Sequence, residues 1–137
     1  MYPPQIVMPM KEDLTSVGFK DVTTSAEVES LIKNTKGTVL MVVNSVCGCA
    51  AGNARPGAKK AVQYTKKPDV IATVFAGFDT EAVAKAREFF VPYPPSSPSM
   101  GLFKDGKLVH FIERHQIEGA TADMVADNLM GAFEKYC

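Results

Sequence analysis

The sequence has no excess of charge of either sign, no long apolar run and no tryptophan. Its 137 residues hold 15 Lys and Arg against 15 Asp and Glu, which excludes the basic surface that is typical of nucleic-acid-binding proteins. No stretch reaches the roughly 20 apolar residues that a membrane-spanning helix needs. We therefore expect neither a nucleic acid nor a membrane as a partner. A chain of this length predicts a single domain, residues 1–137.

The sequence also lacks a signal peptide and is poor in cysteine. It begins Met1-Tyr2-Pro3-Pro4, without the charged region and apolar core of an export signal, and it holds 3 cysteines. We therefore expect the protein in the cytoplasm, where structural disulfides are uncommon. The cysteines are then better interpreted as reactive thiols or metal ligands than as structural cross-links.

The apolar pattern alternates between strand-like and helix-like segments. Thr38–Val43 is a continuous apolar, β-branched run that predicts a central strand covered on both faces. Val70–Phe75 predicts a second buried strand, and Asp105-Gly106 predicts a hairpin. The other expected elements are a short strand at 19–23, hairpin strands at 100–103 and 107–112, and helices near 6–17, 25–37, 58–65, 80–90 and 121–136, with Ser25, Asp79 or Thr80, and Thr121 as caps and Met124 facing the core. This order predicts an α/β fold with a mixed central sheet and helices on both faces.

Two thiols separated by one glycine, Cys47-Gly48-Cys49, follow the predicted central strand. The carboxyl ends of such strands usually present the chemistry of an α/β sheet. A helix that begins here favours a thiolate through its free N–H groups and its dipole. We expect Cys47 to be the nucleophile because it precedes the helix, and Cys49, in the first turn, to resolve a mixed disulfide on Cys47.

A disulfide between these thiols requires a bent backbone. The two Cα atoms must lie roughly 4.4–6.8 Å apart, and we expect Gly48 to permit the bend because it lacks a Cβ atom. The ring is one residue smaller than in a Cys-X-X-Cys pair, so we expect more strain. Strained disulfides are more easily reduced, which predicts a labile bond.

Other interpretations of the cysteines exist. Both are small enough to be buried hydrophobic residues at a strand end. They could instead supply two metal ligands, with His110, His115 or Cys137 completing a tetrahedral site, although these residues are scattered and show no ligand spacing. His115 could act as a base, but a histidine of this kind is more often a surface or strand-end residue without a catalytic role.

The residues after the thiols allow two interpretations. Arg55 could contact the Cys47 thiolate, or an anionic group of a small thiol, or it could be a solvated helix residue. Pro56-Gly57 could interrupt the helix. If the regular helix began only at Pro56, Cys47 would lie in a loop and the dipole would act on it less.

Several segments together resemble a known family. Pro98–Gly106 resembles the thioredoxin-fold segment in which a cis-proline precedes a strand and a hairpin, and it follows a proline-rich stretch without helix or strand character. Nearly the whole chain is similar to the bacilliredoxins, thioredoxin-like proteins with a Cys-Gly-Cys site. The matching segments are residues 7–10, 43–52, 54–56, 73–77, 95–100, 110–112, 114–115 and 117–119, and the C-terminal cysteine.

The resemblance implies a function. In this family, a thiolate attacks the mixed disulfide between a client protein and bacillithiol, takes up the bacillithiol and frees the client. By resemblance, Cys47 is the nucleophile, Cys49 resolves the adduct and Pro98 is the cis-proline. We also expect Gly48, Arg55 and Ser97 to lie beside the substrate, with Pro98. No cofactor is expected to be bound. Bacillithiol or a related low-molecular-weight thiol is the expected co-substrate, and bacillithiolated proteins are the expected partners. A protein disulfide isomerase or general disulfide reductase is the alternative.

The sequence differs from ordinary thioredoxins near the thiols. No tryptophan precedes them, and Met41 occupies the position where thioredoxins place a buried carboxylate. Activation of Cys47 should therefore rest on the helix terminus and a nearby cation. Cys137 matches the terminal cysteine of the family. It could form an intermolecular disulfide, but a helix C-terminus disfavours a thiolate, so we expect a bystander.

Overall fold

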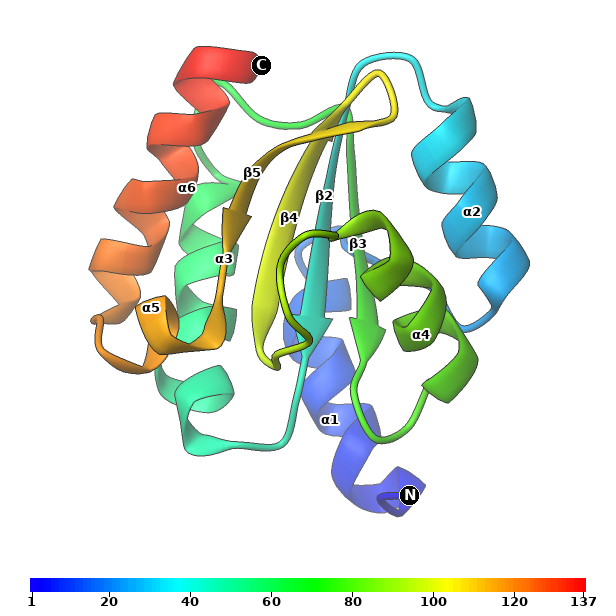
Figure 1. Cartoon of the computed structure of the whole chain (residues 1–137). Helices are drawn as coiled ribbons and strands as arrows, with labels where there is room; N and C mark the ends of the chain where they lie inside the picture. Colours follow the sequence, from blue (N-terminus) through cyan, green and yellow to red (C-terminus); the bar gives the residue numbers. More distant parts are fainter.

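Figure 1 shows the computed structural model of the protein, which describes residues 1–137 and is built around a mixed five-stranded sheet. The strands are β1 (Lys20–Asp21), β2 (Thr38–Asn44), β3 (Val70–Phe75), β4 (Ser99–Lys104) and β5 (Lys107–Ile112), in the order β1-β3-β2-β4-β5. β1, β3 and β2 are parallel, whereas β4 runs antiparallel to both β2 and β5. The predicted mixed sheet is confirmed, with β2 at its centre.

Helices cover both faces of the sheet, as predicted (Figure 1). The helical elements are α1 (Pro4–Thr15), α2 (Ser25–Asn34), η1 (Ala50–Ala54), α3 (Arg55–Ala61), α4 (Thr80–Phe89), α5 (Arg114–Glu118) and α6 (Ala122–Tyr136). α2 and α4 pack together on one face, and α3 and α6 pack together on the other. None of the helices has both the length and the apolar character needed to cross a membrane.

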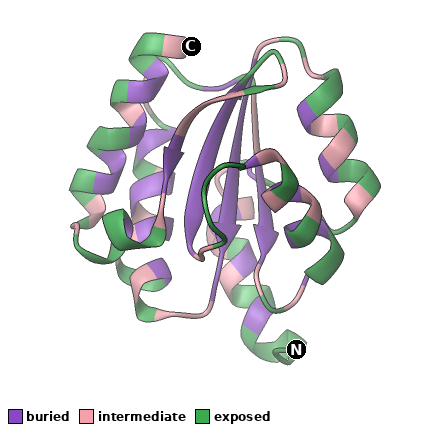
Figure 2. Ribbon diagram, viewed as in Figure 1, coloured by how far each residue is buried: buried purple, intermediate pink, exposed green.

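The central strand β2 separates two hydrophobic cores. Because successive side chains of a strand point to opposite faces, Leu40 and Val42 enter the core beneath α3 and α6. Val39, Met41 and Val43 enter the core beneath α2 and α4. The strand is buried along its whole length (Figure 2), so its continuous apolar run follows from burial on both faces. This packing fixes the position of the residues that follow Asn44.

The hairpin and the last helix form where the sequence predicts them. Asp105 and Gly106 have φ of 50° and 81°, the left-handed pair that an Asp-Gly hairpin turn requires. The hydroxyl of Thr121 accepts a hydrogen bond from the N–H of Met124 and caps α6. Met124 itself is 56% exposed, so the prediction that it faces the core is wrong. Met124 lies in the first turn of α6 and is not among the residues of this helix that are buried against the core.

Other element boundaries differ from the expected ones. Thr24 rather than Ser25 caps α2, accepting from the N–H of Glu27. Asp79 precedes α4, but its carboxylate accepts from the Phe75 N–H and pairs with the buried Lys11 instead of capping the helix. The short helix α5 was not predicted. The helix expected over residues 58–65 begins earlier, at Arg55, and ends at Ala61.

Candidate active site

Cys47 lies between the carboxyl end of β2 and the first helical turn. The N–H groups of Ala50 and Ala51 donate to the Cys47 carbonyl over 3.1 and 3.2 Å, and helical structure continues from Gly48 through η1 into α3. The predicted strand-to-helix junction is therefore confirmed, and a loop that extends to Pro56 is wrong. Instead of breaking the helix, Pro56 lies in the first turn of α3, directly after the π-helical turn η1, a feature that is frequent at functional sites.

The Cys47 and Cys49 sulfurs are joined in a disulfide, with their Cα atoms 5.4 Å apart. This separation lies within the usual range for disulfides. Gly48 has helical geometry without a positive φ, and a Cβ atom built on it would meet nothing within 4 Å. The expectation that the ring needs the conformational freedom of glycine is therefore wrong, because a helical turn already brings residues i and i+2 close enough.

Ser45 is a buried polar residue whose hydroxyl contacts the Cys47 sulfur. Its Oγ lies 3.2 Å from Sγ of Cys47 and accepts a hydrogen bond from the Cys47 N–H over 3.4 Å. A hydroxyl that donates to a thiolate stabilises the negative charge. The sequence analysis did not identify Ser45, although serine two residues before a reactive cysteine is well placed for local hydrogen bonds of this kind.

Arg55 is buried beneath the turn that presents Cys47. Its side chain is 6% exposed, and Nη1 donates to Asn44 Oδ1 over 3.0 Å and to the Ser45 carbonyl over 2.9 Å. Asn44 Oδ1 also accepts from the Ser45 N–H over 2.8 Å. Arg55 is thus neither a solvated residue nor a contact of the thiol. It is a positioning residue that holds the backbone on which Ser45 and Cys47 sit.

Asp13 of α1, which is half-buried, completes this support. Its carboxylate accepts from Lys59 Nζ over 2.7 Å and from Arg55 Nε over 3.2 Å. The hydrogen bond with Lys59, assisted by Arg55, holds the pKa of Asp13 below its ordinary value despite partial burial. The pair of contacts ties α1 to α3 and leaves Arg55 directed toward Ser45.

The Ser97–Pro98 peptide bond is cis, as predicted, and so is Val91–Pro92, which the sequence analysis did not single out. Pro98 is buried, whereas Ser97 is half-buried. The Ser97 carbonyl accepts from Nη1 of Arg114 over 3.2 Å. This contact links the segment before β4 to the first residue of α5.

A cavity of about 310 Å³ opens beside Cys47. It is lined by Tyr2, Ser45, Val46, Cys47, Ala76, Gly77, Arg87, Ser97 and Arg114. Cys49, Gly48 and Arg55 do not line it, so of the predicted site residues the cavity brings together Cys47 and Ser97, next to Pro98. The lining contains no carboxylate and no histidine. A molecule in this cavity therefore meets Cys47 rather than Cys49.

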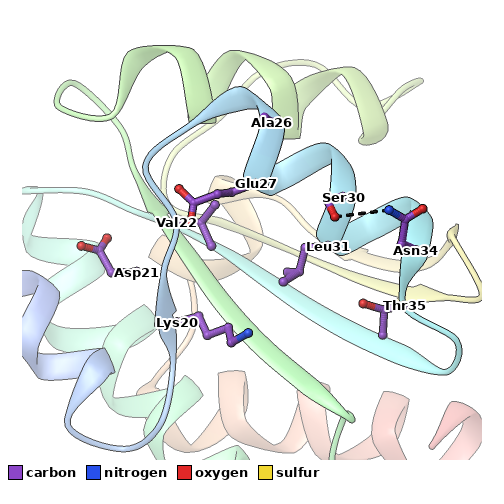
Figure 3. A pocket seen from close by; sticks show the side chains of 9 residues that line it. All are labelled: Lys20, Asp21, Val22, Ala26, Glu27, Ser30, Leu31, Asn34 and Thr35. Atoms are coloured by element: carbon purple, nitrogen blue, oxygen red, sulfur yellow. Dashed lines mark hydrogen bonds between the residues drawn. The ribbon is translucent and has the colours of Figure 1, made fainter.

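A larger hollow of about 720 Å³ lies between β1 and α2. Figure 3 shows that its walls carry mixed side chains such as Lys20, Glu27 and Leu31, with Ser30 and Asn34 hydrogen-bonded to each other. No cysteine, histidine or residue of the thiol motif lines it. Size alone therefore does not identify the site, and the thiol chemistry belongs to the smaller cavity.

The remaining candidate residues lie apart from the thiols. His110 is hydrogen-bonded to Asn128, and the exposed His115 pairs with Glu113. The Cys137 sulfur lies 3.6 Å from the hydroxyl of Thr38, at the opposite end of β2 from the thiol motif, and partial burial raises its pKa. No three His, Cys, Asp or Glu side chains come together as a possible metal site, so the thiol pair gains no further ligand.

Solved structures similar to this one share its fold. Thioredoxin from Plasmodium falciparum matches with a TM-score of 0.59 and 22% identity, over 87% of this chain and 98% of that chain. Thioredoxin from Fasciola hepatica matches with a TM-score of 0.60 and 21% identity, over 87% of this chain and 100% of that chain. The predicted thioredoxin-like fold is confirmed.

Sequence comparison gives the family. A profile of the family described as disulphide isomerase matches residues 2–137. A bacilliredoxin from Cytophaga hutchinsonii is 55% identical over 135 residues, 98% of this chain and 99% of its own length. A bacilliredoxin from Bacillus cereus is 56% identical over 137 residues, 99% of this chain and 95% of its own length. With two thiols at the carboxyl end of a thioredoxin-fold strand, the chain belongs to the bacilliredoxin family and is a thiol–disulfide oxidoreductase.

Proposed function

We propose that the protein removes bacillithiol, or a closely related low-molecular-weight thiol, from client proteins that carry it as a mixed disulfide. The observation that carries this proposal is the cavity beside Cys47, which is lined by Cys47 and Ser97 but not by Cys49. Its volume of about 310 Å³ suits a small thiol, since ligand pockets usually start at roughly 300 Å³. The curated relatives named bacilliredoxin support the same reaction.

The reaction is a pair of thiol–disulfide exchanges. The Cys47 thiolate attacks the bacillithiol sulfur of the mixed disulfide, a new S–S bond forms, and the client sulfur leaves as a thiolate that takes a proton from water. Cys49 then attacks the Cys47 sulfur of the adduct and releases bacillithiol, which leaves the Cys47–Cys49 disulfide. A dithiol or two further low-molecular-weight thiols must reduce this disulfide before the next cycle. Alternatively, a second bacillithiol attacks the adduct directly.

Three features support Cys47 as the attacking thiol. It precedes the first helical turn, whose free N–H groups and dipole favour a thiolate. The hydroxyl of Ser45 lies 3.2 Å from its sulfur. Arg87 and Arg114 add positive charge to the cavity walls. Because Met41 is buried and apolar and the cavity lining lacks carboxylates and histidines, the thiol proton passes to solvent rather than to a buried base.

A second candidate function is disulfide isomerisation or general disulfide reduction in protein substrates. The description of the matching family profile favours it. The two functions share Cys47 and Cys49 and differ in the group that leaves. We also propose that the protein acts in the cytoplasm, because a reaction that begins with a reduced Cys47 needs a compartment that keeps thiols reduced. No bound cofactor takes part in the proposed reaction, and bacillithiol is its co-substrate.

Intact-mass spectrometry of reduced Cys49→Ser tests the proposal. The variant is mixed with a client protein whose single cysteine carries bacillithiol. We expect Cys47 to gain the mass of bacillithiol while the client loses it, and the Cys47→Ser variant to do neither. If the client keeps its bacillithiol while the wild type rearranges the disulfides of a scrambled protein, disulfide isomerisation replaces the proposal.

A further inference from the structure

Arg87 of α4 is a cation without a partner beside Cys47. Its side chain makes no hydrogen bond and no ion pair, and its Nε is buried with nothing to donate to. Burial lowers the pKa of Arg87, but a guanidinium stays protonated at neutral pH. A buried donor that lacks an acceptor is costly. Arg87 lines the cavity that contains Cys47, so an acceptor for its side chain could bind there.

Arg114 of α5 lines the same cavity. Its Nη1 donates to the Ser97 carbonyl over 3.2 Å, and its Nε contacts Glu118 over 3.1 Å. The Glu118 carboxylate is half exposed and is not part of the cavity wall. The contact with Ser97 holds the Arg114 side chain at the cavity, next to the segment that contains cis-Pro98.

Arg87 and Arg114 line one cavity that holds no anionic side chain to neutralise them. No acidic residue lines the cavity, and its other polar side chains are the hydroxyls of Tyr2, Ser45 and Ser97 and the sulfur of Cys47. Guanidinium groups present fixed N–H forks that match carboxylates. A site with two such cations and several hydroxyls, in about 310 Å³, favours a small anionic molecule over a protein segment.

We infer that Arg87 and Arg114 form a carboxylate-binding subsite for the small-thiol half of the mixed disulfide. This inference rests on the proposed function. It adds that these two arginines hold the small thiol, and that the subsite selects which of the two sulfurs Cys47 attacks. With its carboxylate on the arginines, the small thiol places its own sulfur next to Cys47 and points the client sulfur away as the leaving group.

The step that the subsite selects is the first thiol–disulfide exchange of the proposed function. Cys47 forms a disulfide with the small thiol, the original S–S bond breaks, and the client sulfur leaves with the electron pair. Attack on the other sulfur would instead bind the client to Cys47 and release the small thiol. The two directions give adducts of different mass, so the selection can be measured directly.

The test compares two mixed disulfides of one short neutral peptide that contains a single cysteine. One carries mercaptosuccinate, which has two carboxylates, and the other carries thioglycerol, which is uncharged and of similar size. Reduced Cys49→Ser is mixed with each, and mass spectrometry gives the rate and the identity of the Cys47 adduct. We expect the mercaptosuccinate disulfide to react roughly tenfold faster and to place mercaptosuccinate on Cys47.

Substitutions of the arginines separate binding from activation. In Arg87→Gln and Arg114→Gln, each added to Cys49→Ser, we expect the preference for mercaptosuccinate to fall, and in the double substitution to approach unity while more peptide adduct forms. A general effect on the Cys47 thiolate would slow both disulfides equally and leave their ratio unchanged. Lys85→Gln, in α4 but not in the cavity lining, is the matched loss of charge and should keep the wild-type ratio.

The outcomes separate the inference from the function on which it rests. If reduced Cys49→Ser frees neither the peptides nor a client that carries bacillithiol, the proposed function fails. If it frees only that client, the proposed function stands and the carboxylate subsite is wrong. If both peptides are freed at equal rates by every variant, the proposed function stands and the carboxylate subsite is wrong. Thermal unfolding of each variant checks that it is folded. A ratio that falls with rising ionic strength, because salt screens exposed charges, would add support.

Discussion

The hydroxyl oxygen of Ser45 lies 3.2 Å from the sulfur of Cys47. The same oxygen accepts the Cys47 N–H over 3.4 Å, and the Ser45 N–H donates to Asn44 Oδ1 over 2.8 Å. The Cys47 N–H therefore holds the hydroxyl at the sulfur, and the Asn44 side chain fixes the backbone of Ser45. Since the cavity lining offers no histidine or carboxylate, this contact gives the protein a direct means of stabilising a Cys47 thiolate.

Ser45→Ala should make Cys47 less reactive. Removing a hydrogen bond to a charged sulfur costs on the order of 1–2 kcal/mol, so less of the thiol is ionised near neutral pH. We expect alkylation of Cys47 by iodoacetamide, measured in reduced Cys49→Ser, to slow by roughly 5–10-fold. Ser45→Thr keeps a hydroxyl and should recover most of the rate. An unchanged rate in Ser45→Ala would show that the contact does not stabilise the thiolate.

Arg55→Met should destabilise the protein and disturb the turn that holds Cys47. The substitution leaves Asn44 Oδ1 and the Ser45 carbonyl without the buried Nη1 donor. We expect the free energy of unfolding, measured with urea, to fall by about 2–3 kcal/mol. Cys47 alkylation should also change, because the Ser45 hydroxyl is no longer fixed.

Lys59→Met is the matched control for Arg55→Met. Lys59 contacts the same Asp13 carboxylate, but its side chain is 36% exposed, so its loss should cost no more than about 1 kcal/mol. It should leave Cys47 alkylation unchanged. Equal losses of stability in the two variants, with equal alkylation rates, would mean that Arg55 acts only through Asp13 and does not position the turn.

The parts of the fold that are determined by local patterns could be predicted from the sequence. The apolar run Thr38–Val43 predicted a central strand because burial on both faces needs no alternation. Asp105-Gly106 predicted a hairpin because its turn needs two residues with positive φ. The thiol pair was identified by its place after this strand. The cis bond before Pro98 was expected only from the family resemblance, since most X–Pro bonds are trans.

The parts of the site that depend on distant segments could not be predicted. Arg87 and Arg114 come from α4 and α5, and only folding brings both into the lining of the cavity beside Cys47. Arg55 was expected either to contact the Cys47 thiolate or a small-thiol anion, or to be solvated, but its partners in β2 and α1 place it beneath the turn. Helical spacing predicts which face of a helix a residue occupies, but not which atom its side chain contacts. The short helix α5 was missed for a similar reason, since five residues show little periodicity.

Two glycines near the thiols should respond in opposite ways to alanine. A Cβ atom on Gly48 would meet nothing within 4 Å, whereas one on Gly57 would lie 2.7 Å from the side chain of Val125 and 2.9 Å from the Ala122 carbonyl. We expect Gly57→Ala to lower the free energy of unfolding by about 1–3 kcal/mol, because α3 and α6 must move apart. Urea unfolding of both variants measures the difference.

Gly48→Ala should leave stability unchanged or raise it, since alanine favours helices over glycine by up to about 1 kcal/mol. The oxidised variant should still lose the mass of two hydrogens as the Cys47–Cys49 disulfide forms. Failure to form it would restore the idea that the ring needs the flexibility of glycine. A Gly57→Ala variant as stable as the wild type would mean that the two helices separate at no cost.

Asp13 should make stability depend on pH in acid. Its hydrogen bond with Lys59, and then its contact with Arg55, lower its pKa below the ordinary value of 3.8. A carboxylate with a lowered folded pKa contributes stability that is complete above its unfolded pKa and is lost as the pH falls through the folded pKa. Because the side chain is 35% exposed, we expect this contribution to be no more than roughly 1 kcal/mol.

Asp13→Asn removes that titration. Urea unfolding from about pH 7 down to about pH 2 should show the wild type more stable than Asp13→Asn above pH 3.8, with the difference shrinking as the pH falls further. Glu29→Gln is the control, because Glu29 also has a lowered pKa from its partner Lys33, but this pair lies within the single helix α2 and joins no two elements, so its removal should change stability less. A difference between wild type and Asp13→Asn that stayed constant down to the lowest pH would show that the negative charge of Asp13 does not stabilise the contact between α1 and α3, and that only its packing does.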